Sequence, residues 1–183
     1  MNLKEEIERV LDPPASMDHA EHPRAAVIAL LSQVDGLAAL LIKRRERPGD
    51  PWSGHVAFPG GFVSPSDEGS LTAALRELRE EVGVELRRED VVGMLSPARP
   101  LNRPEVEVLP YVAYLEQPPR LSLGSEVEAA RWASLKGLST TRVKVSLKGE
   151  VVEVEGFLVD EWVVWGLTAR LLKELLTRLE PLL

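Results

Sequence analysis

Between Gly61 and Val84 the sequence reads GFVSPSDEGSLTAALRELREEVGV, a polar loop that leads into one amphipathic helix. Apolar residues recur along this helix at three- and four-residue spacings and predict a buried stripe: Leu71, Ala74, Leu75, Leu78 and Val82. Gly83 follows the last turn, where glycine favours the left-handed conformation that ends a helix. The stretch therefore predicts a loop, a helix and a helix stop.

Three glutamates, Glu77, Glu80 and Glu81, are predicted to project from a different face of this helix. Like charges at these spacings destabilise a helix by about 0.2–0.5 kcal/mol per pair, and anions near its C-terminus oppose the helix dipole. Hard divalent cations prefer carboxylate and carbonyl oxygens and would offset this repulsion. A solvated acidic patch is the alternative, but residues 59–61, Pro-Gly-Gly, favour a ligand site because glycines let backbone carbonyls approach closely.

The same stretch resembles the signature of the Nudix hydrolases: Gly, five spacers, Glu, seven spacers, then Arg-Glu-apolar-x-Glu-Glu-x-Gly-apolar. The matching positions are Arg76, Glu77, Leu78, Glu80, Glu81, Gly83 and Val84. Glu68 lies seven spacers before Arg76, but six rather than five after Gly61, so the loop carries one extra residue. Either Glu68 keeps its role in a bulged loop, which we favour, or Asp67 takes the role over.

This resemblance implies an α/β/α sandwich with a mixed β-sheet and the hydrolysis of a nucleoside diphosphate linked to another moiety. It implies that Glu77, Glu80, Glu81 and the carbonyl of Gly61 hold Mg²⁺ or Mn²⁺, which neutralises phosphate oxygens and activates water. Arg76 is expected to orient the carboxylates. The general base stays open between Glu77, Glu80 and a carboxylate from a later loop.

Residues 40–61, LLIKRRERPGDPWSGHVAFPGG, resemble the signature of the coenzyme A pyrophosphatase branch of that family, although three positions and one spacing depart from it. The resemblance favours coenzyme A as substrate. ADP-ribose, nucleotide sugars and dinucleotides remain alternatives, as does a nucleotide-sensing module without catalysis. Arg44 and Arg47 are predicted to bind the diphosphate and Trp52 to stack on a base, with Glu68 as a further substrate-binding candidate.

The composition of the 183 residues, 44% of them hydrophobic, predicts one domain over residues 1–183, in which residues 1–24 form a short helix and a linker. A net charge of −7 argues against nucleic-acid or membrane partners. No cysteine is present, which excludes disulfides and a cysteine nucleophile. The N-terminus resembles neither a signal peptide nor a membrane span, so we expect a cytoplasmic protein. Two Asn and two Gln in the whole chain predict a thermophilic source.

Periodicity and turn signals place the remaining elements. Asn2 and Glu5 predict a capping box at the start of the first helix, and Glu126 with Glu128 is consistent with another helix start. Strands are predicted at residues 25–32, 37–43, 55–58, 91–95, 105–115, 143–147 and 151–157. A last helix is predicted over residues 161–179, capped by Asp160, and its wide apolar surface is compatible with a homodimer. Trp162 and Trp165 are assigned to the core or to an interface.

Overall fold

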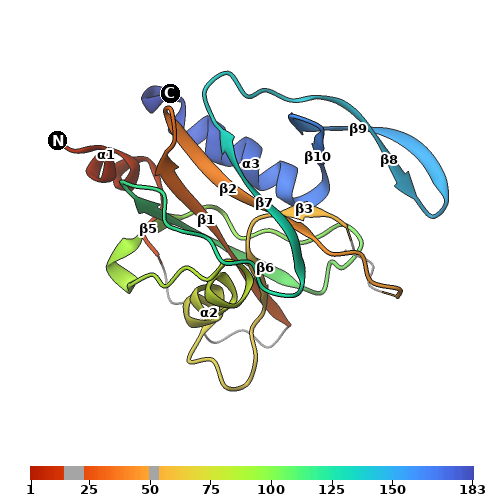
Figure 1. Ribbon diagram of the computed structural model, residues 1–183, viewed down its shortest axis with the longest axis horizontal. Coiled ribbons are helices and arrows are strands. Elements are labelled where there is room, and N and C mark those ends of the chain that lie inside the picture. The colour runs from red at the N-terminus through yellow and green to blue at the C-terminus, as the bar shows by residue number, and fades with distance from the viewer. Residues whose placement is uncertain (15–22, 50–53) are drawn as a thin grey trace.

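A mixed β-sheet forms the centre of the computed structural model, which describes residues 1–14, 23–49 and 54–183 (Figure 1). The helices are α1 (Leu3–Val10), α2 (Ser70–Val82) and α3 (Gly166–Leu179), with short 3₁₀ helices at Arg88–Asp90 and Glu180–Leu182. The strands are β1 (Arg24–Gln33), β2 (Leu37–Arg44), β3 (Val56–Ala57), β4 (Gly60–Phe62), β5 (Val91–Met94), β6 (Glu107–Leu115), β7 (Val127–Ser134), β8 (Thr141–Leu147), β9 (Glu150–Val159) and β10 (Trp162–Val164).

The central sheet is split between β1 and β2. These strands begin as a hairpin at Asp35 and Gly36, whose φ angles of 50° and 110° suit a tight turn, and then separate. In the gap, β3 pairs with β2 and β4 pairs with β1, both antiparallel. Outside the gap, β7 lies along β2, and β6 runs parallel to β1 with β5 at its far side. The split therefore brings β4 into the interior of the sheet.

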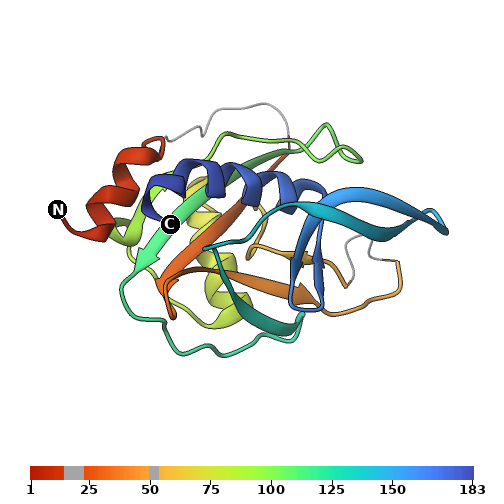
Figure 2. The ribbon, with the colours of Figure 1, turned by 90° about the horizontal axis from the view of Figure 1, so that it is seen from above.

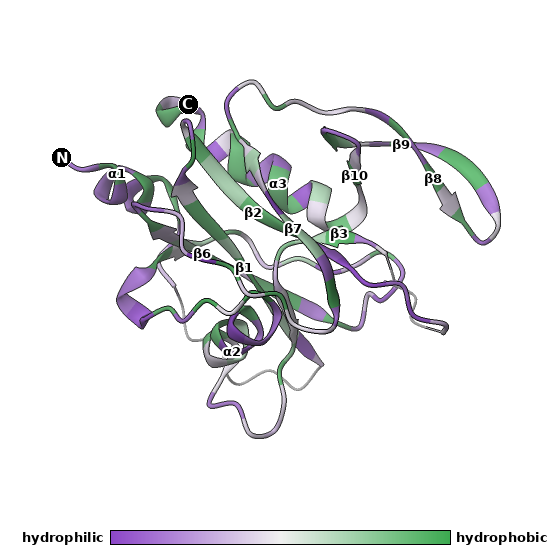
Figure 3. Cartoon of the chain, viewed as in Figure 1, coloured by the Kyte–Doolittle hydropathy of each residue, from purple (hydrophilic) through white to green (hydrophobic). Residues whose placement is uncertain are grey.

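Helices cover both faces of this sheet, with α2 on one face and α3 on the other (Figures 1 and 2). Strand β2 shows how the two faces are separated. Its residues Leu40 and Ile42 belong to the hydrophobic cluster of Leu78 in α2, whereas Leu41 belongs to the cluster of Leu172 in α3. The central strands are mostly hydrophobic, as Figure 3 shows. The predicted α/β/α sandwich with a mixed sheet is confirmed.

A second, three-stranded antiparallel sheet has the order β10-β9-β8. Its β8–β9 hairpin extends away from the central sheet (Figure 2). Lys148 and Gly149 form the two-residue turn with φ angles of 51° and 82°, as their sequence predicts. This sheet packs against the α3 face, where β10 approaches β3.

The prediction of a last helix from residue 161 is wrong at its beginning. Trp162–Val164 forms β10, because the aromatic and β-branched side chains suit a strand and pair with the end of β9. The helix starts at Gly166, and Asp160 is not its cap but a turn residue with a φ of 53°.

No helix in the described ranges is long and apolar enough to cross a membrane.

The helix start predicted near Glu126 and Glu128 is also wrong. Residues Val127–Ser134 form β7, which pairs with β2 along nearly its whole length. The capping box of α1 is confirmed. The Glu5 amide donates to Asn2 Oδ1 at 2.9 Å, and the Asn2 amide donates to Glu5 Oε2 at 3.2 Å.

Candidate functional site

Arg76 lies at the centre of an ion-pair network on α2. Its Nε and Nη2 donate to the two carboxylate oxygens of Asp67 at 2.9 and 3.0 Å. Its Nη1 donates to Glu77 Oε1 at 3.0 Å and to Glu80 Oε2 at 3.2 Å, and its Nη2 also reaches the carbonyl of Phe62. One guanidinium therefore fixes the loop and two helix carboxylates relative to one another, as expected for an orienting residue.

The loop before α2 places Asp67, not Glu68, beside Arg76, so the preference for Glu68 in that position is wrong. The amide of Asp67 donates to the carbonyl of Ser64 at 3.0 Å, and the turn so formed directs the Asp67 side chain inward, where it is only 3% exposed. The amide and hydroxyl of Ser64 donate to Asp67 Oδ2. The hydrogen bonds from Arg76 lower the pKa of Asp67 to about 2. Glu68 is exposed, and its role in substrate binding stays a prediction.

Glu81 is buried, so the three glutamates differ in exposure, which their spacing on the helix did not indicate. The residue is only 6% exposed, and the Gly60 amide donates to Glu81 Oε1 at 2.8 Å. Burial raises the pKa of Glu81 to about 8, with the Glu77 charge adding to the rise, while the Gly60 amide and the Arg44 charge oppose it. Burial likewise raises the pKa of Glu77.

The backbone of β4 lies directly against these carboxylates. A Cβ atom added at Gly61 would lie 2.5 Å from Glu77 Oε1, closer than any side chain permits. Gly60 is held equally tightly on its other side, because a Cβ there would lie 2.3 Å from the carbonyl oxygen of Ala26 in β1. The glycine pair thus allows the backbone of β4 to approach the Glu77 and Glu81 carboxylates closely.

The loop that precedes β7 docks on the C-terminal end of α2. The amide of Ser122 donates to the carbonyl of Val82 at 2.8 Å, and the amide of Gly124 donates to the carbonyl of Glu81 at 2.9 Å. A Cβ at Gly124 would lie 2.2 Å from the carbonyl oxygen of Glu80. Helix carbonyls that lack an intrahelical partner are satisfied here by the loop, which fixes its position.

This docked loop brings a fourth carboxylate, Glu126, to the glutamates of α2. The charge of Glu126 contributes to the raised pKa of both Glu77 and Glu81. The less favoured alternative, a general base on the later loop that carries Glu126 and Glu128, anticipated this residue. The helix start assigned to its segment hid the connection, since Glu126 lies at the end of the docked loop, just before β7.

Both arginines predicted to bind substrate, Arg44 and Arg47, lie beside these carboxylates. Arg47 Nη1 is 3.0 Å from Glu126 Oε1, and both side chains are about half exposed. The charge of Arg44 acts on Glu81. Between them, Arg45 donates from Nε to the carbonyl of Ser125 at 3.0 Å and so ties β2 to the docked loop. The third candidate, Trp52, and the linker residues 15–22 lie outside the described residues.

The carboxylates of Glu77, Glu80 and Glu81 and the carbonyl of Gly61 are oxygen donors of the kind that a hard divalent cation prefers. Glu77 and Glu81 are two mutually repelling carboxylates in a mostly buried place, a combination that a cation would offset. Within the described residues, no three acidic or histidine side chains already converge on one point. Glu80 is 54% exposed and turned to Arg76, so its carboxylate must rotate to join a shared cation.

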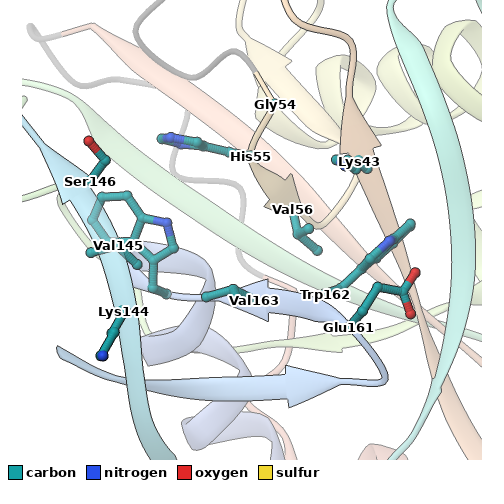
Figure 4. Close-up of a pocket in the computed structure, with 11 residues that line it drawn as sticks. Lys43, Gly54, His55, Val56, Lys144, Val145, Ser146, Glu161, Trp162 and Val163 are labelled. Atoms are coloured by element: carbon teal, nitrogen blue, oxygen red, sulfur yellow. The ribbon is translucent and has the colours of Figure 1, made fainter. Parts of the chain in front are cut away.

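A cavity of about 390 Å³ lies on the α3 face of the sheet (Figure 4). Its lining residues are Lys43, Gly54, His55, Val56, Lys144, Val145, Ser146, Glu161, Trp162, Val163 and Trp165. The rings of His55 and Trp165 pack edge to face, with 5.3 Å between their centroids. Lys43 follows Ile42 in β2 and therefore points away from α2. The sequence indicated no such cavity, because its residues come from separate strands.

The chain is similar to known proteins in sequence and in fold. A family model described as NUDIX domain matches residues 21–153. A protein of Photorhabdus laumondii named "Uncharacterized Nudix hydrolase NudL" is 31% identical over 172 residues, which cover 89% of each chain. The mouse "Mitochondrial coenzyme A diphosphatase NUDT8" is 39% identical over 90 residues, covering 49% of this chain and 42% of that protein. The crystal structure of a MutT/nudix family protein from Enterococcus faecalis has a TM-score of 0.60 at 23% identity, covering 100% of this chain and 70% of that one.

Proposed function

Because this chain belongs to the Nudix hydrolases, which cleave a nucleoside diphosphate linked to another moiety, we propose that it is a metal-dependent diphosphatase of a nucleotide derivative. Coenzyme A is the first substrate to test. Residues 40–61 and the partial similarity to the mouse coenzyme A diphosphatase support this choice. ADP-ribose, nucleotide sugars and dinucleotides are the competing substrates.

The observation that carries the proposal is that the buried Glu81 and the half-buried Glu77 lie against the backbone of Gly60 and Gly61. In the bound state, Glu77, Glu80, Glu81 and the carbonyl of Gly61 would hold Mg²⁺ or Mn²⁺, which neutralises phosphate oxygens and makes water a better nucleophile. Hydrogen bonds from Arg76 already hold Glu77 and Glu80, and the Gly60 amide holds Glu81.

Positively charged and acidic side chains around the helix supply the remaining roles. Arg44 and Arg47 lie beside the carboxylates and are suited to bind phosphate oxygens through paired N–H groups. Glu126 joins Glu77 and Glu80 as a candidate general base, since its charge acts on Glu77 from the loop just before β7. The α3-face cavity offers room for a part of the substrate that does not react.

Substitution of Glu80 by glutamine tests the proposal. Glu80→Gln removes one cation ligand, so we expect kcat to fall by about 100-fold or more on the substrate that the wild type cleaves best. The melting temperature should hardly change, because Glu80 is half exposed. Rates are measured with coenzyme A, ADP-ribose and dinucleotides in Mg²⁺, Mn²⁺ or chelator, and product masses locate the broken bond.

The matched control is Glu85→Gln, an exposed glutamate just beyond the helix, which should retain the wild-type rate. A wild-type rate for Glu80→Gln would overturn the assignment of the cation site. Tight nucleotide binding by the wild type without any metal-dependent product would instead identify a nucleotide-binding module.

A further inference from the structure

Arg131 of β7 holds the turn that joins β9 to β10. Its Nη1 and Nη2 donate to the two carboxylate oxygens of Glu161 at 3.1 and 2.8 Å, and its Nη1 also donates to the carbonyl of Val159 at 3.0 Å. Its guanidinium carbon lies 4.3 Å from the ring centre of Trp162. Its Nη1 also lies 3.4 Å from Oδ2 of Asp160, the turn residue with positive φ. One side chain thus contacts every residue from 159 to 162.

Two of these contacts belong to the wall of the α3-face cavity. Glu161 and Trp162 line it, and Figure 4 shows them side by side, with Lys43 above them and His55 across the cavity. The hydrogen bond from Arg131 is the main cause that lowers the pKa of Glu161 to about 2, and the charge of Lys43 contributes. The Glu161 carboxylate is therefore ionised at the rim, and Arg131 is the partner that neutralises it.

Short segments connect this cavity to the acidic helix on the other face of the sheet. Val56 lines the cavity, and only four residues later Gly60 contacts Glu81, a span of at most about 14 Å for an extended chain. Strand β7 makes the second connection, since Glu126 precedes it and Arg131 is its fifth residue. The two places are therefore close along the backbone, and the cavity volume of about 390 Å³ is in the range of about 300–1,000 Å³ found for ligand pockets.

We infer that Arg131 is a positioning residue for the substrate, which rests on the proposed function. It keeps Trp162 in the cavity wall and neutralises Glu161, so that an anionic part of a nucleoside diphosphate derivative enters the cavity. Without Arg131, the Glu161 carboxylate at the rim loses its paired hydrogen bonds and keeps the weaker influence of Lys43, so its negative charge repels the phosphates of the ligand. The loss falls on binding and not on the chemical step, because Arg131 does not contact the carboxylates of α2.

The experiment compares Arg131→Met and Arg131→Lys with the wild type, and Arg142→Met serves as control. Arg142 lies in β8, is exposed and, among the described residues, forms a long ion pair of 3.9 Å with Glu153. For Arg131→Met we expect KM for the diphosphate substrate and Kd for ADP to rise by about 10-fold or more, with kcat within about 3-fold of wild type. Arg131→Lys should lie between, and Arg142→Met should match the wild type.

The double variant Arg131→Met with Glu161→Gln separates positioning from simple structural support. Removing the Glu161 charge should recover at least a third of the lost ADP affinity on a logarithmic scale, whereas loss of packing alone would not be recovered. An unchanged KM and Kd in Arg131→Met, a loss confined to kcat, or no recovery in the double variant would overturn the inference.

Failure of the proposed function and failure of the role of Arg131 give different results. If Arg131→Met does not fold, Arg131→Lys decides, because it keeps the charge but loses the paired hydrogen bonds. If the wild type hydrolyses none of the diphosphates, the proposed function fails, and the ADP affinities still decide the role of Arg131. A wild type that does not bind ADP overturns the role of Arg131 directly.

Discussion

At the scale of single residues, the Asp67–Arg76 pair offers a direct test of how the site is oriented. Asp67→Asn removes the charged, twofold-bonded partner of a mostly buried guanidinium, and we expect the free energy of unfolding to fall by about 2 kcal/mol. We expect kcat to fall by about 10-fold or more, because Arg76 then holds Glu77 and Glu80 less firmly. Urea unfolding and initial rates measure the two effects.

Glu85→Gln, at an exposed glutamate just beyond α2, is the control and should leave both quantities at wild-type values. The pH dependence adds a second check. The pKa of Asp67 is lowered from 3.8 to about 2 in the folded state, so its stabilisation is fully present above pH 3.8 and disappears as pH falls through about 2. The difference in unfolding free energy between wild type and Asp67→Asn should shrink over this window. A constant difference would contradict the assignment.

Residue types and spacing were sufficient to identify Arg76 and the three glutamates, but not their exposure or partners. Asp67 and Glu68 are adjacent carboxylates, and only the turn formed with Ser64 decides which of them faces Arg76. Glu81 is buried because its partner is a backbone amide 21 positions earlier in the chain. Neither fact has a local signal, since both depend on how distant backbone segments meet.

At the scale of elements, the contact between α2 and the loop before β7 sets where Glu126 lies. Gly124→Ala places a methyl group 2.2 Å from the carbonyl oxygen of Glu80, so the loop must shift. We expect a loss of about 1–3 kcal/mol in the free energy of unfolding and a reduced kcat, measured by urea unfolding and by initial rates. Ser125→Ala changes an exposed neighbour and should have neither effect. Wild-type behaviour of Gly124→Ala would show that the loop position does not matter.

Strong periodicity and turn signals predicted α2 and both hairpins. The misassigned elements are those with ambiguous patterns. The segment Trp162–Val164 continues directly into Trp165, and such a short apolar run fits a buried strand or a helix equally well. Strand β7 begins with alternating charged and apolar residues, and its pairing with β2 overrides the helix start that Glu126 and Glu128 indicated.

At the scale of the whole molecule, the α/β/α sandwich was predictable because a central helix lies between strand-rich segments and a second long helix follows them. The α3-face cavity was not predictable. Its walls come from β2, β3, β8, β10 and the residues around them, which approach one another only when the three-stranded sheet packs against the central one. No window of sequence contains that information.

The scarcity of amide side chains leads to a prediction for the whole protein. Two Asn and two Gln among 183 residues are typical of thermophilic proteins, which contain few thermolabile side chains. We expect a melting midpoint above about 70 °C by calorimetry, compared with about 45–65 °C for ordinary mesophilic domains. A midpoint within the mesophilic range would contradict a thermophilic source.

The loop on the end of α2 is anchored by main-chain atoms. The amides of Ser122 and Gly124 make the anchoring bonds, and the intervening Leu123 is 44% exposed. Every amino acid except proline supplies an amide hydrogen. Positions 122 and 123 are therefore suitable for randomisation in an engineering library, because new side chains can be displayed next to the acidic helix while the anchor itself is retained.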